Sequence, residues 1–423
     1  MIEDARSVAR PLTLRTRLKH WLIRFVVEVL FRVSQAARYL PRFRRANSLE
    51  SCEVLLTGTF HSSEWITAFL QPLAMAQSCR KVVLVTTLAV LESDGITIIH
   101  PPQVLRRIIG DVPARLLTFA WQAIKSRPDL VGGFHISINA LVAQAVASLV
   151  GSRSMYVCVG GPIEVLDGGL WGESRFFGKL DRADPVIEAK LLRAVRRFDA
   201  VVLMGAKAGK YFSEHGVSPK RLFRITGGVD SSRFGQPRKN RTVDLIFVGR
   251  LVPIKSLDLL LATVNELVKG GRKIRARIVG SGPMEQELKE LTCKMGIENH
   301  VEFAGFVPDV IEELENAKCF VLTSRSEGLS LAMIEAMLAG AVPVVADVGD
   351  LGDLVEDGVN GILVDSRDPN DFALCIDELL GDENKLLACS QVAYNTAIQC
   401  SFEFLADDWN ALLSTFNHAA NAE

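Results

Sequence analysis

The stretch that decides the fold reads Cys319-Phe320-Val321-Leu322-Thr323-Ser324-Arg325-Ser326-Glu327-Gly328-Leu329-Ser330-Leu331-Ala332-Met333-Ile334-Glu335-Ala336-Met337. Its first four residues are an unbroken apolar run, which predicts a strand buried on both faces. The polar residues that follow include a glycine and predict a turn. Ser330 is placed to cap a helix whose apolar face continues to Leu338, and Gly340 is placed to end it. A further strand is expected at 342–346, so the stretch has the pattern of a parallel α/β unit.

The loop of this unit is a candidate binding site. Open α/β sheets bind anions and nucleotides at free backbone N–H groups, where a helix starts just beyond the carboxyl edge of the sheet. Two acids flank this point, Glu327 in the loop and Glu335 in the helix. Because a carboxylate repels a phosphate, we expect both acids to accept hydrogen bonds from neutral sugar hydroxyls.

Glu327 and Glu335, with seven residues between them, resemble the paired-glutamate motif of the family 4 retaining glycosyltransferases. Other segments agree with that family in order along the chain. Val248-Gly249-Arg250-Leu251 followed by Lys255 resembles its donor-phosphate loop, Gly280-Ser281-Gly282-Pro283 its second glycine loop, and Gly228-Val229-Asp230 with Phe234 its interdomain segment. The family normally has Gly after the Lys, where this chain has Ser256. The resemblance covers most of residues 130–400.

The resemblance implies an α/β fold of the GT-B type, with two Rossmann-like domains that face each other across a cleft. It implies a glycosyltransferase of the hexosyltransferase type, which moves a sugar from a nucleotide-diphosphate sugar to an acceptor and retains the anomeric configuration. Neither a metal nor a cofactor is expected beside the donor substrate.

The resemblance also implies roles for single residues. Arg250 and Lys255 stabilise the charge that grows on the leaving diphosphate, Glu327 holds donor-sugar hydroxyls, and Glu335 holds the nucleotide ribose. Without the resemblance, basic residues just past a buried strand could equally belong to a solvated loop. The other donor-binding positions are expected in the glycine loops and at the helix start: Gly58, Gly249, Gly280, Gly282, Gly328, Leu329, Ser330 and Leu331.

Three further features fall in the first half of the chain. His135 follows a strand-like run, and the resemblance implies that it contacts the donor sugar from the opposite domain; the alternative is a satisfied polar residue at a strand end. Gly58 stands alone where the family usually has a richer glycine loop. The loop Val159-Gly160-Gly161-Pro162 with Glu164 is either acceptor-side or structural.

Strand-like and helical patterns alternate along the chain, which predicts parallel sheets with helices on their faces. In the first half, strand-length apolar runs recur at 53–56, 82–86, 96–99, 130–134, 155–159, 200–204 and 222–225. We expect five parts: a basic amphipathic N-terminal segment (1–50), a Rossmann-like acceptor-side domain (51–225), a linker (226–242), a Rossmann-like nucleotide-sugar-binding domain (243–400), and a C-terminal helix (401–423) that by analogy crosses back to the first domain.

The N-terminal segment is strongly basic. Residues 1–45 contain eleven Lys and Arg against three Asp and Glu. The run 21–33 is apolar except at Arg24, Glu28 and Arg32, which share one helical stripe. It is too short and too charged to span a bilayer, which needs roughly 20 apolar residues. We expect a helix that lies on an anionic membrane, and thus a cytoplasmic protein peripheral to the inner face of the cell membrane. The alternative is a helix packed on the protein's own body, or a poorly ordered extension.

Composition narrows the classes of protein and partner that fit this sequence. A net charge of −1 argues against nucleic acid as the main partner. The eight cysteines form no C-x-x-C pair and the seven histidines show no ligand spacing, so a reducing cytosol is favoured over a disulfide scaffold or a metal site. The basic N-terminal segment favours a membrane-associated glycan or lipid-linked saccharide of polysaccharide biosynthesis as acceptor. The alternatives are a nucleotide-sugar epimerase of similar fold and a non-catalytic sugar-nucleotide-binding subunit at the membrane.

Overall fold

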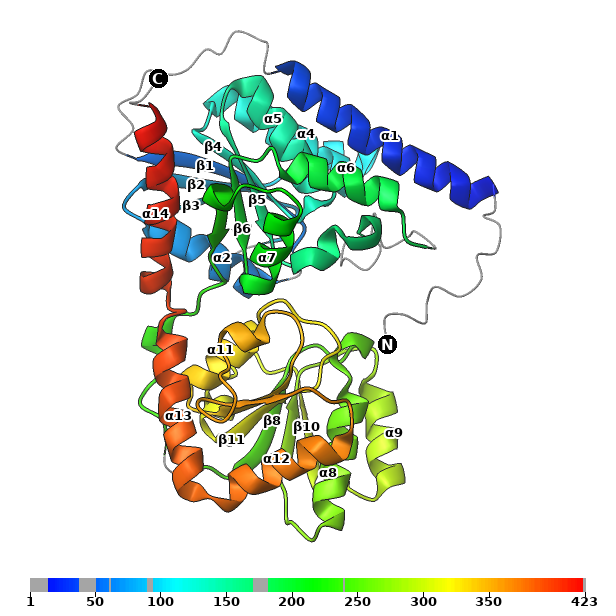
Figure 1. The fold of residues 1–423 in the computed structure, drawn as a ribbon, viewed down its shortest axis with the longest axis vertical. Coiled ribbons are helices and arrows are strands. Elements are labelled where there is room, and N and C mark those ends of the chain that lie inside the picture. The colour runs from blue at the N-terminus through cyan, green and yellow to red at the C-terminus, as the bar shows by residue number, and fades with distance from the viewer. Residues whose placement is uncertain are drawn as a thin grey trace.

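The structure is a computed structural model that describes residues 14–37, 51–60, 62–89, 94–169, 182–238 and 240–420. Two parallel α/β domains make up this part of the chain and lie one above the other in Figure 1. The expected pair of Rossmann-like domains is therefore confirmed. Parts of the expected N-terminal segment (1–13 and 38–50), of the linker (239) and of the C-terminal helix (421–423) lie outside the described residues.

The first domain is built on a sheet of seven parallel strands in the order β3-β2-β1-β4-β5-β6-β7. The strands are β1 (Cys52–Thr57), β2 (Cys79–Val85), β3 (Ile96–Ile99), β4 (Leu130–Phe134), β5 (Arg153–Cys158), β6 (Ala200–Leu203) and β7 (Leu222–Arg224). The central strands are buried on both faces, which explains their unbroken apolar runs. The strand order reverses between β1 and β4, and such switch points are where open α/β sheets bind ligands.

Helices cover both faces of this sheet. The helices are α2 (Ser63–Met75), α3 (Gln103–Ile109), α4 (Asp111–Ser126), α5 (Leu141–Val150), α6 (Pro185–Val195) and α7 (Ala206–Glu214). One face of the sheet packs against α2, and the other packs against α4, α5, α6 and α7. The helix α3 packs on α4.

The helix α1 (Leu14–Ala36) forms an additional layer outside α5 and α6 (Figure 1). Its inner side buries Ile23, Val27 and Phe31 in a cluster with apolar residues of α5 and α6. Its outer side leaves a row of apolar residues exposed: Leu14, Leu18, Trp21, Leu22, Phe25, Val29 and Val33. One side of α1 therefore packs on the protein's own body, and its other side is an apolar surface.

The second domain is built on six parallel strands in the order β10-β9-β8-β11-β12-β13. The strands are β8 (Val243–Val248), β9 (Ala276–Val279), β10 (Val301–Gly305), β11 (Ala317–Leu322), β12 (Val342–Ala346) and β13 (Ile362–Val364). The helices are α8 (Leu257–Lys269), α9 (Glu285–Met295), α10 (Ile311–Glu315), α11 (Leu331–Leu338), α12 (Pro369–Gly381) and α13 (Glu383–Ile398). Here the switch point lies between β8 and β11.

The opening stretch of the sequence folds as its pattern predicted. The strand β11 is buried, and α11 begins at Leu331 with Ser330 as its N-cap, whose Oγ accepts a hydrogen bond from the Met333 backbone N–H at 3.3 Å. Gly340 follows the helix in a left-handed conformation with φ of 78°, which a residue with a side chain rarely adopts.

The last helix, α14 (Phe402–Ala420), lies against the first domain although it follows the second (Figure 1). Its residues Leu405, Trp409, Leu412 and Leu413 are buried in the same core cluster as α2 and the first sheet. The Asn410 side-chain oxygen accepts a hydrogen bond from the Ser78 backbone N–H at 2.8 Å. Core packing of this kind fixes the chain's return to the first domain.

Within the described residues, no helix combines the length and the apolar character that crossing a membrane requires. The exposed apolar row on α1 lies opposite the side of that helix that packs on α5 and α6.

We predict that Leu412→Ala lowers the free energy of unfolding by about 2–5 kcal/mol, because it removes a fully buried side chain from the core shared by α14 and the first sheet. The measurement is the midpoint of urea unfolding followed by circular dichroism. The matched control is Leu374→Ala on α12, where the leucine is 61 % exposed. Equal effects of the two substitutions would show that α14 does not share the core of the first domain.

Candidate active site

Two loops meet at the switch point of the second sheet. One follows β8 and contains Gly249, Arg250 and Lys255; the other follows β11 and leads through Glu327 into α11. Because β8 and β11 are adjacent and parallel, their carboxyl ends lie at the same edge of the sheet. The topology therefore brings together residues that are about 70 positions apart in sequence.

Lys255 and Glu327 form an ion pair at this switch point. The Lys255 Nζ lies 2.6 Å from the Glu327 Oε1, and the two side chains are 18 % and 11 % exposed. The Ser324 hydroxyl donates to the same oxygen at 2.5 Å. Both contacts fall on Oε1, so within the described residues Oε2 is the oxygen left to accept from a ligand hydroxyl.

The backbone around Lys255 is held by the β11 loop. Ser256, which stands where the family normally has Gly, adopts a left-handed conformation with φ of 48°. Its Oγ accepts a hydrogen bond from the Arg325 Nε at 3.1 Å, and the Arg325 backbone N–H donates to the Ile254 carbonyl at 2.8 Å. Ser256 thus provides a side-chain contact that Gly would lack, at the cost of a less favoured backbone conformation.

The two glycine loops pack directly on each other. A Cβ on Gly280 would lie 1.9 Å from the Gly249 carbonyl oxygen, and one on Gly282 would lie 2.3 Å from the Leu251 carbonyl oxygen. The Leu251 backbone N–H donates to the Ser281 carbonyl at 2.9 Å. Only glycine permits this approach, so Gly280 and Gly282 fix the position of the loop that carries the neighbouring Arg250, whose side chain is exposed.

The loop before α11 touches the first domain. A Cβ on Gly328 would lie 2.7 Å from the Val159 carbonyl oxygen, at the carboxyl end of β5. Leu329 and Leu331 pack against the core clusters of both domains. The predicted donor-binding segment Gly328 to Leu331 therefore lies at the contact between the domains, and the first backbone N–H groups of α11 start there.

Glu335 lies one turn into α11 and is partly buried. Burial raises its pKa to about 7; Arg233 lowers the pKa, whereas Asp309 and Glu64 raise it further. Glu64 belongs to α2 of the first domain, so Glu335 also faces the contact between the domains. A carboxyl group with this pKa changes its charge near neutral pH.

His135 stands at the carboxyl end of β4, at the switch point of the first sheet. Its backbone φ of 62° is in the left-handed region, an arrangement that tends to occur at functional sites. The ring is parallel to that of Trp65 at 6.4 Å, and its Nδ1 lies 3.0 Å from the Glu164 Oε1. The neighbouring chain thus fixes the direction of the imidazole.

Glu164 is a residue whose importance the sequence did not show. Its buried carboxylate also accepts hydrogen bonds from the Ile136 and Gly160 backbone N–H groups and from the Tyr156 hydroxyl, at 2.7 to 2.9 Å. Burial alone would raise its pKa, but His135 and the backbone donors together lower it, so the group is a carboxylate. The sequence signal that could have pointed to Glu164 was its position four residues after Gly160, in a glycine-rich loop.

Gly58 lies at the end of β1, beside β4. A Cβ there would lie 2.5 Å from the Phe60 ring and 2.9 Å from Phe134, and the Gly58 carbonyl accepts a hydrogen bond from the Arg115 Nη1 at 2.6 Å. Arg115 is fully buried, and burial lowers its pKa to about 10. The structure shows why Gly58 must be small, and Arg115 is a second residue that sequence reasoning missed.

Contacts between the two domains place the carboxyl ends of the two sheets toward each other. The Lys207 Nζ at the start of α7 lies 3.0 Å from Asp347, which follows β12. The Asp353 carboxylate accepts a hydrogen bond from the Ala206 backbone N–H and lies 3.6 Å from Arg224. The residues predicted for the site, from His135 to Glu335, therefore come from loops and from the first turns of α11 on the facing sides of the domains.

The comparisons with known proteins agree with this architecture. Residues 229–396 match the sequence model of the family described as glycosyl transferases group 1. The chain is 30 % identical over 236 residues to a D-inositol 3-phosphate glycosyltransferase of Geodermatophilus obscurus, which covers 49 % of this chain and 51 % of the relative. It is 33 % identical over 193 residues to the enzyme of that name from Frankia alni, which covers 41 % and 47 %. The chain thus spans about half the length of the curated relatives that it matches.

Solved structures resemble the chain over both domains. Sucrose-phosphate synthase from Thermosynechococcus elongatus superposes with a TM-score of 0.67 at 16 % identity, over 88 % of this chain and all of that one. Alr3699/HepE of Anabaena in complex with UDP-glucose gives a TM-score of 0.63 at 17 % identity over the same shares. At these identities the likeness establishes the fold. Residues 229–396 therefore match the glycosyl transferases group 1 model, in a chain whose two Rossmann-like domains have the GT-B arrangement.

Proposed function

We propose that the protein is a retaining glycosyltransferase, which moves a sugar from a nucleotide-diphosphate sugar to a membrane-associated glycan or lipid-linked saccharide of polysaccharide biosynthesis. The observation that carries this proposal is the Lys255–Glu327 pair at the switch point of the second sheet, inside the domain that matches the group 1 family. The matched relatives carry glycosyltransferase names, and Alr3699/HepE holds UDP-glucose.

The Lys255 ammonium and the Arg250 guanidinium bind the donor diphosphate. In the reaction the bond between the sugar and the diphosphate oxygen breaks, and a bond from the acceptor oxygen to the same sugar carbon forms. The electron pair of the broken bond stays on the phosphate oxygen, which takes up the acceptor proton. Cations near this oxygen stabilise the charge as it grows, which is often the largest single contribution to catalysis.

The acids and His135 position the donor. Glu327 accepts sugar hydroxyls through Oε2 while Lys255 and Ser324 hold Oε1. Glu335 accepts the ribose hydroxyls from its place one turn into α11. His135, fixed by Glu164, contacts the sugar from the first domain. Retention follows from the family resemblance.

The membrane-borne acceptor is supported by α1. Its outer side carries exposed apolar residues, and the helix contains five basic residues and one acid. A helix of this composition can lie in the interface of an anionic bilayer, and it would keep the first domain at the membrane.

We predict that Lys255→Ala lowers the rate of sugar transfer by about 100- to 1000-fold, because the leaving diphosphate loses a cation. The unfolding midpoint should change far less. The measurement is release of nucleoside diphosphate from each of a panel of nucleotide sugars, with a membrane extract as acceptor source. Lys269→Ala, an exposed lysine at the end of α8, is the control and should keep full activity.

Parallel losses of rate and stability in Lys255→Ala would contradict the phosphate role. Conversion of one nucleotide sugar into another without transfer would identify an epimerase instead, and donor binding without turnover would identify a non-catalytic subunit.

We predict that the affinity for UDP-glucose, used as probe, rises by about fivefold as the pH increases through about 7. Below this pH Glu335 is protonated and one of its oxygens donates; above it both oxygens are charged acceptors for ribose hydroxyls. Glu335→Gln should bind with an affinity that does not change over this range, measured by calorimetry. Glu312→Gln on the exposed side of α10 should keep the wild-type pH dependence. An unchanged pH dependence in Glu335→Gln would exclude Glu335 from ribose binding.

A further inference from the structure

A hollow of about 380 Å³ opens between α1 and the start of α6, in the first domain and apart from the loops at the switch points. Basic and aromatic side chains make up most of its lining: Arg17, His20, Trp21 and Arg24 of α1, and Arg182 from the segment before α6. The lining also includes one acid, Asp184. None of these residues has a role in the proposed transfer reaction.

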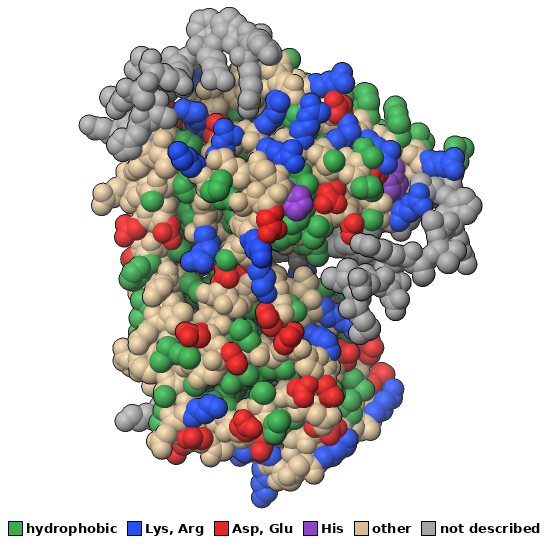
Figure 2. All heavy atoms as spheres, viewed as in Figure 1, with side chains coloured by type: hydrophobic (Ala, Val, Ile, Leu, Met, Phe, Trp, Pro, Cys, Tyr) green, Lys and Arg blue, Asp and Glu red, His purple; other side chains and the backbone are tan. Residues whose placement is uncertain are grey.

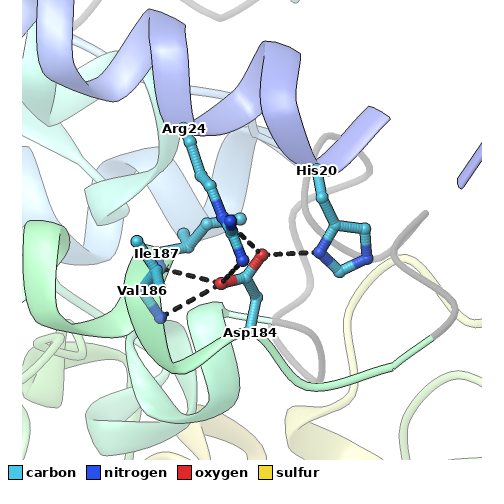
Figure 3. Close-up of polar contacts among 5 residues, drawn as sticks. All are labelled: His20, Arg24, Asp184, Val186 and Ile187. Atoms are coloured by element: carbon cyan, nitrogen blue, oxygen red, sulfur yellow. Dashed lines mark hydrogen bonds and ion pairs between the residues drawn. The ribbon is translucent and has the colours of Figure 1, made fainter. Parts of the chain in front are cut away.

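Asp184 is the structural centre of this hollow (Figure 3). Its side chain is 1 % exposed and caps α6 by accepting from the Val186 and Ile187 backbone N–H groups at 3.0 and 3.1 Å. It also accepts from the Arg24 Nε and Nη2 at 3.1 and 3.0 Å, and lies 2.5 Å from the His20 Nδ1. Burial alone would raise its pKa, but these hydrogen bonds together lower it.

The hydrogen bonds of this network neutralise the negative charge of Asp184, so the hollow keeps a net positive charge. The carboxylate is matched by Arg24, so the positive charges of Arg17 and Arg182 exceed the acidic charge of the lining. A hollow with this balance selects an anion.

His20 gives a second and independent sign of a ligand. Its side chain is 6 % exposed, and its Nε2 is buried without a hydrogen-bond partner in the described structure. Figure 3 shows the ring with Nδ1 toward Asp184 and its other nitrogen turned away from it. A buried polar atom of this kind calls for a hydrogen-bond partner, which a ligand in the hollow can provide.

Trp21 connects the hollow to the exposed side of α1. It lines the hollow, is 58 % exposed, and stacks on Phe25 at 5.4 Å. Both rings belong to the exposed apolar row of α1, and in Figure 2 exposed apolar and basic side chains gather over the upper domain. Tryptophan prefers the boundary between acyl chains and headgroups, which places the hollow at headgroup depth when the apolar row is inserted.

We propose that this hollow binds the phosphate of an anionic phospholipid headgroup while the apolar row of α1 lies among the acyl chains. Arg17 and Arg182 supply charge-assisted hydrogen bonds to the phosphate oxygens. The inference rests on the membrane location in the proposed function and adds a specific lipid site to it.

The test is flotation of the full chain with vesicles of phosphatidylcholine and phosphatidylglycerol. Arg17→Gln and Arg182→Gln should each weaken binding about tenfold or more, because each removes a charge-assisted hydrogen bond. Arg32→Gln is the matched control: it removes the same charge from the same helix, outside the hollow, where Arg32 pairs with Glu28. It should weaken binding by about fivefold or less, the effect of a surface charge alone. Equal losses in the three variants would overturn the site and leave only general attraction to an anionic surface.

A water-soluble probe separates the two sources of phosphate. Dihexanoyl phosphatidylglycerol should raise the unfolding temperature of the wild type and of Arg32→Gln but not of Arg17→Gln. Inorganic phosphate at the same concentration should give a smaller rise. The lipid assignment fails if inorganic phosphate is equally effective or if the lipid has no effect.

The same preparations distinguish this inference from the proposed function. Arg17→Gln should keep the wild-type response to nucleotide sugars, since Arg17 lies outside the candidate active site. If nucleotide sugars have no effect on any variant while the lipid result holds, the glycosyltransferase proposal fails and the lipid site stands.

Discussion

The ion pair between Lys255 and Glu327 is the contact on which the candidate site depends. It joins the loop after β8 to the loop after β11, at the edge of the sheet where the strand order reverses. The left-handed Ser256 and the Arg325 hydrogen bonds hold these two loops in one position, and the close-packed Gly280 and Gly282 hold the loop after β8 against the loop after β9. Catalysis of phosphate departure needs such preorganisation, because charges that must move during the reaction stabilise it less.

The second constraint is the close contact between the domains. Gly328 lets the loop before α11 meet the carboxyl end of β5, and Leu329 and Leu331 belong to the packing of both cores. The helix α14 also ties the chain to the first domain, because its buried residues belong to the core cluster of α2 and the first sheet. The facing switch points are therefore held together by packing between the two domains.

Much of this arrangement could be predicted from the sequence, because buried parallel strands leave unbroken apolar runs and the motif glycines occur in a fixed order. The runs around Leu56, Val157 and Leu322 all proved to be strands. Glu164 and Arg115 could not be found in this way. Both act through contacts between residues far apart in sequence. The sequence signal for Glu164 was limited to its place in a glycine-rich loop, and nothing in the local pattern of Arg115 distinguishes it from a surface charge. The same holds for Asp184, whose network joins α1 and α6 across 160 positions.

The most direct test of the central claim is a thermal shift of the full chain against a panel of nucleoside diphosphates and their sugars. If Lys255, Glu327 and the start of α11 form a nucleotide-sugar site, one base should be selected. Ligand at about 100 times its dissociation constant should then stabilise the fold by about 2.7 kcal/mol. No stabilisation by any member of the panel would contradict the claim and leave the paired loops as scaffold.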